Sequence, residues 1–404
     1  MQRPSLEVAD IVRGAGQQFI EHSRHWITRQ HLKVLRAIRS CRTASLGYHV
    51  DECTRCGYSG HSYNSCRNRH CPKCQANARM RWIEGRRKEL LPVPYAHIVF
   101  TVPHLLAQLA LQNKKLIYTF LLRLSAETLI DVCRNPKYLG AEIGFFSILH
   151  TWSQQLMPHP HVHCVVPAGG LSFDHRRWVS VNLKYRFFLP KKVLQKVFRA
   201  KLREALNDAF AAGQIEFHGK IKHLSDPKAF RAFIRGLFRH EWVIHCKRPF
   251  GGPEYVLRYL GRYTHRVAIS NHRLVSFTNA EVTFLWRDRA HGNREQPMTL
   301  TADEFLTRFL FHLLPKGFVR IRNFGYLANR RRRILLQLCF QLLGSGGNAF
   351  TQSSQDQAPA AIRLCNCPQC GAPMHVVFRV SPPSFFPRSP PGASGADWEF
   401  DWQL

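Results

Sequence analysis

Acidic side chains are scarce in this 404-residue chain, because 26 Asp and Glu face 58 Lys and Arg and leave a formal net charge of +32. Such an excess of positive charge needs a polyanionic partner and indicates that the protein binds nucleic acid. Charge alone selects no chemistry, since many non-enzymatic nucleic-acid-binding proteins share it. Hydrophobic residues still make up 45% of the chain, enough for the cores of two or three packed domains.

Long apolar runs are also missing. No segment approaches the roughly 18 uncharged apolar residues of a membrane span, and residues 1–13 lack the apolar centre of a secretory signal. We therefore expect a cytoplasmic protein with no membrane partner. The 13 cysteines do not form an extracellular disulfide framework, because six of them fall in three C-x2-C pairs. That spacing indicates zinc and a reducing compartment.

Mixed helix and strand patterns predict an α+β fold. β-branched and aromatic runs predict strands at residues 95–102, 145–150, 161–166 and 242–246, with a hairpin of 274–277 and 282–286. Helical spacing of apolar residues predicts two short helices within 1–40, and further helices at 77–91, 105–133, 191–212, 226–238, 253–264 and 334–343. The strand order does not follow from these patterns.

Changes in composition divide the chain into three parts. Pro92 and Pro94 follow a basic helix, so we expect residues 1–92 to form a zinc-binding, DNA-recognition domain. Residues 93–333 are expected to form the sheet domain. The remaining residues, 334–404, are rich in Gly, Ser, Gln, Ala and Pro, and we expect a flexible tail that carries one C-x2-C knuckle.

Two cysteine pairs, Cys53-x2-Cys56 and Cys71-x2-Cys74, are separated by 14 residues. Two such knuckles can surround one tetrahedral Zn²⁺, so the sequence predicts that these four thiolates hold one zinc ion. A second metal or a Cys3His site stays open, because further candidate ligands lie nearby: Cys41, His49, His61, Cys66 and His70. Cations among the ligands are expected to contact DNA, unless the zinc is purely structural; they are Arg67, Arg69 and Lys73.

A smaller cysteine cluster lies near the end of the chain. Cys367 and Cys370 form one C-x2-C pair, with Cys365 and His375 as further candidates. This pair either completes a zinc site with Cys339 or stays an unpaired knuckle.

The segment MPHPHVHCVV, residues 157–166, places His161 and His163 two apart in a strand-like run. Alternate side chains of a strand share a face, so both imidazoles can hold one divalent ion. The alternative is a His-rich turn without metal. His150 lies eleven residues before His161, at the end of the preceding predicted strand, so a tight connection would bring it alongside as a third ligand.

The segment PEYVLRYLGRYTHR, residues 253–266, places Tyr259 and Tyr263 on one face of a predicted helix. A phenol with a pKa of about 10 is a poor nucleophile at neutral pH unless a cation or a base favours its ionised form. The neighbouring cations, suited to a phosphate or a phenolate, are Arg258, Arg262 and Arg266. Taken alone, the tyrosine stripe fits core packing or base stacking better than catalysis.

A His-x-His strand followed by a Tyr-x3-Tyr helix resembles the HUH endonuclease superfamily. The chain is most similar to two-tyrosine rolling-circle insertion-sequence transposases of the IS91 group, over most of residues 20–330. Three blocks carry this resemblance: SYNSCRNRHCPKCQ (62–75), LHTWSQQLMPHPHVHCVVPAGGLS (149–172) and KRPFGGPEYVLRYLGRYTHRVAISN (247–271).

The resemblance implies a small zinc-binding domain followed by an HUH (Rep-like) antiparallel-sheet domain with helices, which is the catalytic domain. It implies that His161 and His163 bind Mg²⁺ or Mn²⁺, and similarity to conjugative relaxases adds His150. Tyr259 and Tyr263 would be the nucleophiles, and Tyr259 would make the first cut and form a 5′-phosphotyrosine. The implied partners are single-stranded DNA at element ends and target sites and the host replication machinery, in the bacterial nucleoid.

Two other functions remain open. A plasmid or phage replication initiator or relaxase shares the histidine and tyrosine motifs, but it need not carry the cysteine-rich segment 53–74. A non-catalytic zinc DNA-binding protein would use Tyr259 and Tyr263 only to stack bases. Tyr→Phe variants separate these readings, because a phenylalanine ring still stacks but cannot attack phosphorus.

Overall fold

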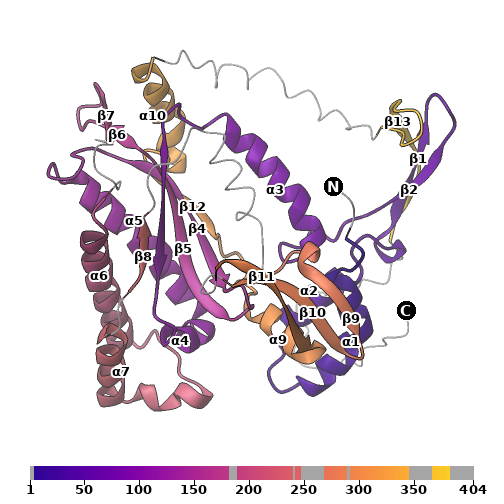
Figure 1. Ribbon diagram of the computed structural model, residues 1–404, viewed down its shortest axis with the longest axis horizontal. Coiled ribbons are helices and arrows are strands. Elements are labelled where there is room, and N and C mark those ends of the chain that lie inside the picture. Colours follow the sequence, from indigo (N-terminus) through magenta and orange to yellow (C-terminus); the bar gives the residue numbers. More distant parts are fainter. Residues whose placement is uncertain are drawn as a thin grey trace, which may run out of the picture.

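The computed structural model describes residues 4–181, 189–239, 242–246, 268–288, 292–344 and 366–382, with only the backbone of 76–78. The described chain has three parts (Figure 1). A helix-covered central sheet lies on one side, a helical unit with the three-stranded sheet β9-β10-β11 lies beside it, and a second small three-stranded sheet projects at the far side. The predicted α+β class is therefore confirmed. No helix in the described ranges is long and apolar enough to cross a membrane.

The central sheet has five strands, all in antiparallel pairs. Its order is β12-β4-β5-β3-β8. The strands are β3 (Tyr95–Thr101), β4 (Gly144–Trp152), β5 (Pro158–Pro167), β8 (Ile244–Cys246) and β12 (Ile321–Gly325). The three central strands, β3, β4 and β5, are buried over most of their length. Burial on both faces explains why their sequences read as apolar runs instead of alternating patterns.

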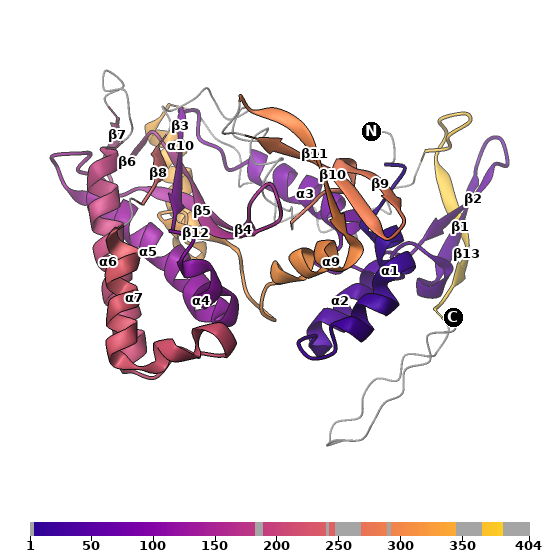
Figure 2. The ribbon, with the colours of Figure 1, turned by 60° about the horizontal axis from the view of Figure 1, so that its bottom comes forward.

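Four helices cover one face of this sheet: α4 (Leu106–Gln112), α5 (Lys114–Arg134), α6 (Lys191–Ala211) and α7 (Pro227–Arg239). Figure 2 shows them gathered on one side of the strands. Phe100 of β3 and Phe198 of α6 pack with ring centroids 4.9 Å apart in this core. The single helix predicted for 105–133 is divided at Asn113, whose side chain instead bonds the backbone of Glu216.

The opposite face of the sheet is covered by α10 (Asn329–Leu342) at one end and carries histidines at the other. α10 packs Leu335 and Leu336 against Tyr95 and Phe146 at one end of the strands. At the other end, the same face of β4 and β5 carries the histidines of the HPHVH segment. A small hairpin of β6 (Gly169–Leu171) and β7 (Trp178–Ser180) extends beyond β5.

The first forty residues pack with a segment far away in the sequence. α1 (Val8–His22) and α2 (Arg29–Arg39) share one core with α9 (Ala302–Phe311) and with the sheet β9-β10-β11. These strands are β9 (Leu274–Thr278), β10 (Glu281–Asp288) and β11 (Arg294–Thr301). The core includes Phe19, Phe284 and Phe305. The proposed boundary near residue 92 therefore does not separate two independent cores.

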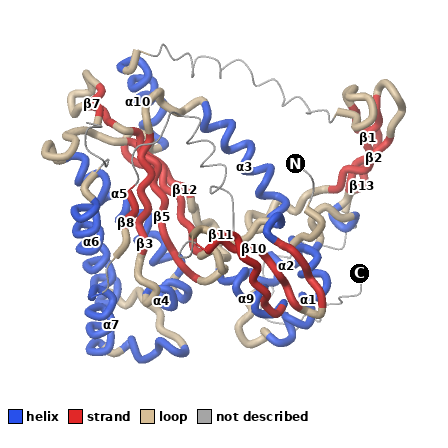
Figure 3. The backbone as a smooth tube through the Cα atoms, in the orientation of Figure 1, coloured by secondary structure: helices blue, strands red, loops and turns tan. Residues whose placement is uncertain are grey.

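The small sheet has the order β13-β1-β2, with β1 (Tyr48–Cys53), β2 (Ser59–Tyr63) and β13 (Met374–Val380). α3 (Pro72–Arg87) runs from the base of this sheet towards the central sheet (Figure 3). A flexible tail was predicted for 334–404. The described part of 334–404 departs from that prediction at β13, which pairs with β1 from Tyr48 to Cys53, whereas α10 corresponds to the helix predicted at 334–343. Three short 3-10 helices complete the described elements: Ala44–Leu46, Gly219–Ser225 and Asn271–Arg273.

Candidate active site and metal centres

Three histidines converge on the sheet face that α10 leaves uncovered. His161 and His163 share a face of β5, and His150 of β4 is the direct cross-strand partner of His161. Neighbours in register on adjacent strands bring their side chains together. One nitrogen of each ring lies within 4.8 Å of the others. The structure thus assembles the three histidines that were predicted as metal ligands.

The three rings are held in place by their surroundings. His150 and His163 are only 3% and 7% exposed, and the His150 ring stacks on Trp152 with centroids 4.7 Å apart. Nδ1 of His161 donates to the carbonyl oxygen of His159 at 2.7 Å. That bond fixes the proton on Nδ1 and makes Nε2 the basic nitrogen of a neutral ring, which is the form that binds a metal.

A fourth histidine, His97 of β3, orients His163. His97 Nε2 lies 2.8 Å from His163 Nδ1, and the planes of the two rings are nearly parallel, with an angle of 5° between them. A His163 ring that offers Nε2 to a metal carries its proton on Nδ1 and donates it to His97. The sequence analysis missed His97. The only signal in the sequence was a lone histidine in the otherwise apolar run YAHIVFT. In the structure this histidine is 5% exposed.

This donor set fits a divalent transition metal. Three neutral imidazoles attract divalent transition-metal ions more strongly than Mg²⁺, which prefers oxygen ligands. Three protein ligands also leave coordination positions for a phosphate.

His97 gives a test of this arrangement. We expect His97→Ala to weaken Mn²⁺ binding about 10- to 100-fold, because the hydrogen bond that orients a ligand is lost. Calorimetric titration of the purified protein with Mn²⁺ measures the effect. His97→Gln, which keeps a polar group facing His163, should recover part of it. An unchanged affinity in His97→Ala would remove His97 from the site.

The predicted nucleophiles Tyr259 and Tyr263 lie outside the described residues, as do Arg258, Arg262 and Arg266. The described chain before them ends in β8, which pairs with β3 and so lies two strands from the histidines of β5. The described chain after them resumes at Ala268, in the core shared with α1 and α9.

Cysteine residues form two clusters, and these differ from the predicted grouping. Cys71 and Cys74 lie with Cys41 and Cys66, whereas Cys53 and Cys56 lie with Cys367 and Cys370. The prediction that Cys53, Cys56, Cys71 and Cys74 share one zinc ion was therefore wrong. Within each cluster, the four Sγ atoms all lie within 4.8 Å of one another.

The reason is the β1–β2 hairpin. Cys53 and Cys56 lie at its tip, while Cys41 and Cys66 flank its base. Six residues of β1, at about 3.3 Å each, separate tip from base by roughly 15–20 Å. Four sulfur atoms around one zinc must lie about 4 Å from one another, so the two C-x2-C pairs cannot share an ion.

The first cluster joins the base of the hairpin to two helices. Cys41 follows α2, and Cys71 and Cys74 stand at the start of α3. Sγ of Cys74 lies 3.5 Å from both Cys41 and Cys66. Cys41 and Cys71 are 0% exposed and belong to the core of α1, α2 and α9. Cys66, first a secondary candidate, is thus a full member of this cluster.

Two other candidate ligands lie elsewhere. His70 is buried, and its Nε2 accepts a hydrogen bond from the backbone N–H of Leu314 at 3.2 Å. Cys339 is buried against Tyr95 and Leu336 under α10. Neither residue belongs to a cysteine cluster in the described part of the chain.

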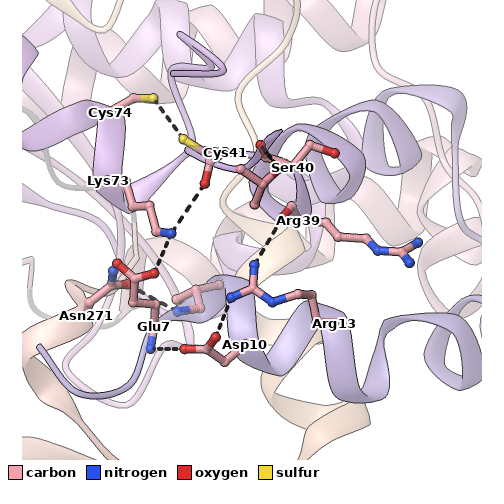
Figure 4. A network of polar contacts seen from close by, with 11 residues as sticks. Glu7, Asp10, Arg13, Arg39, Ser40, Cys41, Lys73, Cys74 and Asn271 are labelled. Carbon is pink, nitrogen blue, oxygen red and sulfur yellow. Dashed lines mark hydrogen bonds and ion pairs between the residues drawn. The ribbon is translucent and has the colours of Figure 1, made fainter. Parts of the chain in front are cut away.

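The predicted DNA-binding cations near the first cluster differ in their surroundings. Lys73 forms an ion pair with Glu7 and donates to the carbonyl oxygen of Cys41 at 3.3 Å (Figure 4). Arg69 donates to the carbonyl oxygen of Phe318 at 2.7 Å. Both side chains therefore tie the cluster to neighbouring segments, although Arg69, like Arg67, is exposed.

Comparison with known protein families shows that the chain is a transposase. Residues 11–102 match a family described as "Transposase zinc-binding domain", and residues 144–334 match one described as "Putative transposase". The first match contains the Cys41 cluster, and the second contains the histidines of β4 and β5. A protein of this class acts on DNA, which agrees with the formal net charge of +32.

Two relatives specify the family. The chain is 47% identical over 380 residues to "Putative transposase y4qJ" of Sinorhizobium fredii, covering 92% of this chain and 94% of the relative. It is 32% identical over 356 residues to "Transposase for insertion sequence element IS801" of Pseudomonas savastanoi pv. phaseolicola, covering 85% and 82%. The chain belongs to the IS91-group transposases. No solved structure matches it significantly.

Proposed function

We propose that this transposase cuts and rejoins single-stranded DNA at the His150–His161–His163 cluster, with Tyr259 and Tyr263 as nucleophiles. The observation that carries the proposal is the cluster itself, because three imidazoles on adjacent central strands form a compact ligand set. β8, the last described strand before the proposed nucleophile segment, lies two strands from β5, which carries His163. The fold of the catalytic part would then be of the HUH type.

Tyr259 would attack the scissile phosphorus while the bond from phosphorus to the 3′ oxygen breaks. The phenol loses its proton to solvent and the departing 3′ oxygen gains one, which leaves a 5′-phosphotyrosine and a free 3′-hydroxyl. A divalent ion on the three histidines would polarise the phosphate and stabilise the charge that develops on its oxygens. One phosphodiester bond replaces another, so no ATP is needed.

Two tyrosines would allow strand exchange. While the 5′ end stays bound to Tyr259, Tyr263 can attack a second strand, and the free 3′-hydroxyl can then resolve the first linkage. The same hydroxyl can prime synthesis, which would make the host replication machinery a partner. The basic side chains Arg258, Arg262 and Arg266 would hold the phosphates. His97 and Trp152 keep the ligand rings in place.

Oligonucleotides labelled at either end test the proposal. Purified protein with Mn²⁺ and a single strand carrying the element end should give a denaturant-resistant adduct only with a 3′ label. A 5′ label should appear in a shorter, protein-free product that ends in a 3′-hydroxyl. DNA binding without any adduct would support the non-catalytic alternative instead. A label retained on the opposite fragment would contradict the stated polarity.

A further inference from the structure

The second cysteine cluster joins two distant segments of the chain. Cys53 and Cys370 are 317 positions apart, yet their Sγ atoms lie 3.4 Å from each other. Cys56 and Cys367 are 311 positions apart, with Sγ atoms at 3.6 Å. All four are free thiols without a disulfide. Cys367 and Cys370 lie outside both matched family regions, which end at residues 102 and 334.

The two halves of the cluster have the same local structure. Each reads Cys-x2-Cys-Gly, and Gly57 and Gly371 have φ of +70° and +73°. These positive φ values turn the chain directly after each knuckle, in a conformation that glycine adopts without strain. Equivalent elements thus meet at one point from opposite ends of the chain.

Backbone hydrogen bonds repeat in the same way. The N–H of Cys53 donates to Tyr58 and that of Cys367 to Ala372, at 2.8 Å and 2.7 Å, each five positions ahead. The N–H two residues after each first cysteine points at its sulfur, since Arg55 and Gln369 both donate at 3.4 Å. Donors of this kind stabilise a thiolate, which is the form of cysteine that binds a metal.

The surrounding structure is too small to hold itself together. The apolar core beside the sulfur atoms consists of Cys53, Cys367 and Met374, with three partly buried neighbours. β13 pairs with β1 but is exposed along most of its length, including Phe378 at 60%. A sheet with so little buried apolar area needs a metal or a disulfide to stay folded.

We propose that Cys53, Cys56, Cys367 and Cys370 bind a second zinc ion, separate from that of the Cys41 cluster. The two knuckles and the sheet β13-β1-β2 then form one zinc ribbon, of which the first half lies near the amino end and the second half near the carboxyl end. Sulfur atoms 3.4–3.6 Å apart are close to the spacing of about 3.8 Å that four Zn–S bonds of about 2.3 Å require.

The site closes the chain into a loop. The residues between Cys56 and Cys367 include the whole central sheet, so the folding of the β1–β2 hairpin depends on a segment made three hundred residues later. A chain that ends before Cys367 would keep the first zinc site and lose the second. The amino-terminal zinc-binding region would then be incomplete on its own.

Zinc content tests this proposal directly. Native mass spectrometry and elemental analysis of the full-length, reduced protein, made in the His161→Ala/His163→Ala background so that the histidine cluster holds no metal, should give two zinc ions per chain. Cys367→Ser/Cys370→Ser and Cys53→Ser/Cys56→Ser should each give one. Cys339→Ala, a matched control outside both clusters, should keep two. A single zinc in the background with all cysteines intact, or two after Cys367→Ser/Cys370→Ser is added to it, would overturn the proposal.

Hydrogen–deuterium exchange supplies a second readout. In Cys367→Ser/Cys370→Ser, exchange should rise in β1, β2 and β13 and stay unchanged in α1 and α9. This pattern shows that the variant is otherwise folded and that only the ribbon has lost its support. Unchanged protection of β13 would mean that the strand pairs without metal, which would also overturn the proposal.

Discussion

The His161→Ala/His163→Ala variant is expected to lose DNA cleavage by at least about 10³-fold. These two rings supply two of the three nitrogen atoms of the cluster, and His150 alone cannot hold an ion against water. Without the ion, charge that develops on the scissile phosphate is not stabilised. Adduct formation on a labelled single strand, measured under single-turnover conditions, gives the rate.

DNA binding by this variant should stay within a few-fold of wild type, because both substitutions remove neutral side chains from a chain of net charge +32. His218→Ala is the matched control, since its side chain is 71% exposed and belongs to no metal cluster in the described residues. It should cleave like wild type. Cleavage retained in the double histidine variant would place the catalytic centre elsewhere.

The Cys71→Ser/Cys74→Ser variant is expected to lose the fold of the unit that contains α1, α2 and α9. Cys71 is fully buried in that core and caps the start of α3, so a metal shared with Cys41 links α2, α3 and the base of the β1–β2 hairpin. A structural zinc contributes about 10–16 kcal/mol in small zinc modules, comparable with the whole stability of a domain. Zinc content, limited proteolysis and thermal unfolding measure the loss.

Cys133→Ala provides the comparison for that variant. Cys133 is equally buried, but it lies in the core of α5 and belongs to neither cluster. Its replacement should lower the stability by about 1 kcal/mol and leave the zinc content unchanged. An equal and small effect of both variants would mean that the Cys41 cluster holds no structural metal.

The histidine cluster was accessible from the sequence because strand geometry has a fixed period. The spacing of His161 and His163 places both on one face of a strand, whatever the fold. The prediction that His150 joins them depended on direct pairing of β4 with β5, and the register confirms this pairing. His97 could not be found in this way, since its place beside His163 depends on the neighbour of β5 on the other side.

The cysteine grouping failed for a different reason. Spacing along the chain was taken as nearness in space, but a hairpin carries Cys53 and Cys56 away from the cysteines at its base. The true partners, Cys367 and Cys370, come from a segment that composition marked as a tail. No local pattern reports a contact between residues 311 positions apart.

Three of the strands that the sequence analysis missed, β11, β12 and β13, lie at sheet edges. β11 is mostly exposed and contains Pro297, and β12 is half-buried with two polar residues, so neither shows the apolar run of a central strand. β13 was not predicted because the segment that contains it was classified, with the proline-rich residues that follow, as a tail. These strands are defined by their pairing partners, whereas β3, β4 and β5 are defined by their own burial.

Mapping the covalent bond tests the central claim most directly. The adduct of wild-type protein with a single-stranded element end is trapped, digested with nuclease and protease, and analysed by tandem mass spectrometry. The account predicts a nucleotide phosphate on Tyr259, a shift to Tyr263 in Tyr259→Phe, and no adduct in the double Phe variant. A phosphate on any other residue, or an adduct that survives in the double variant, would contradict it.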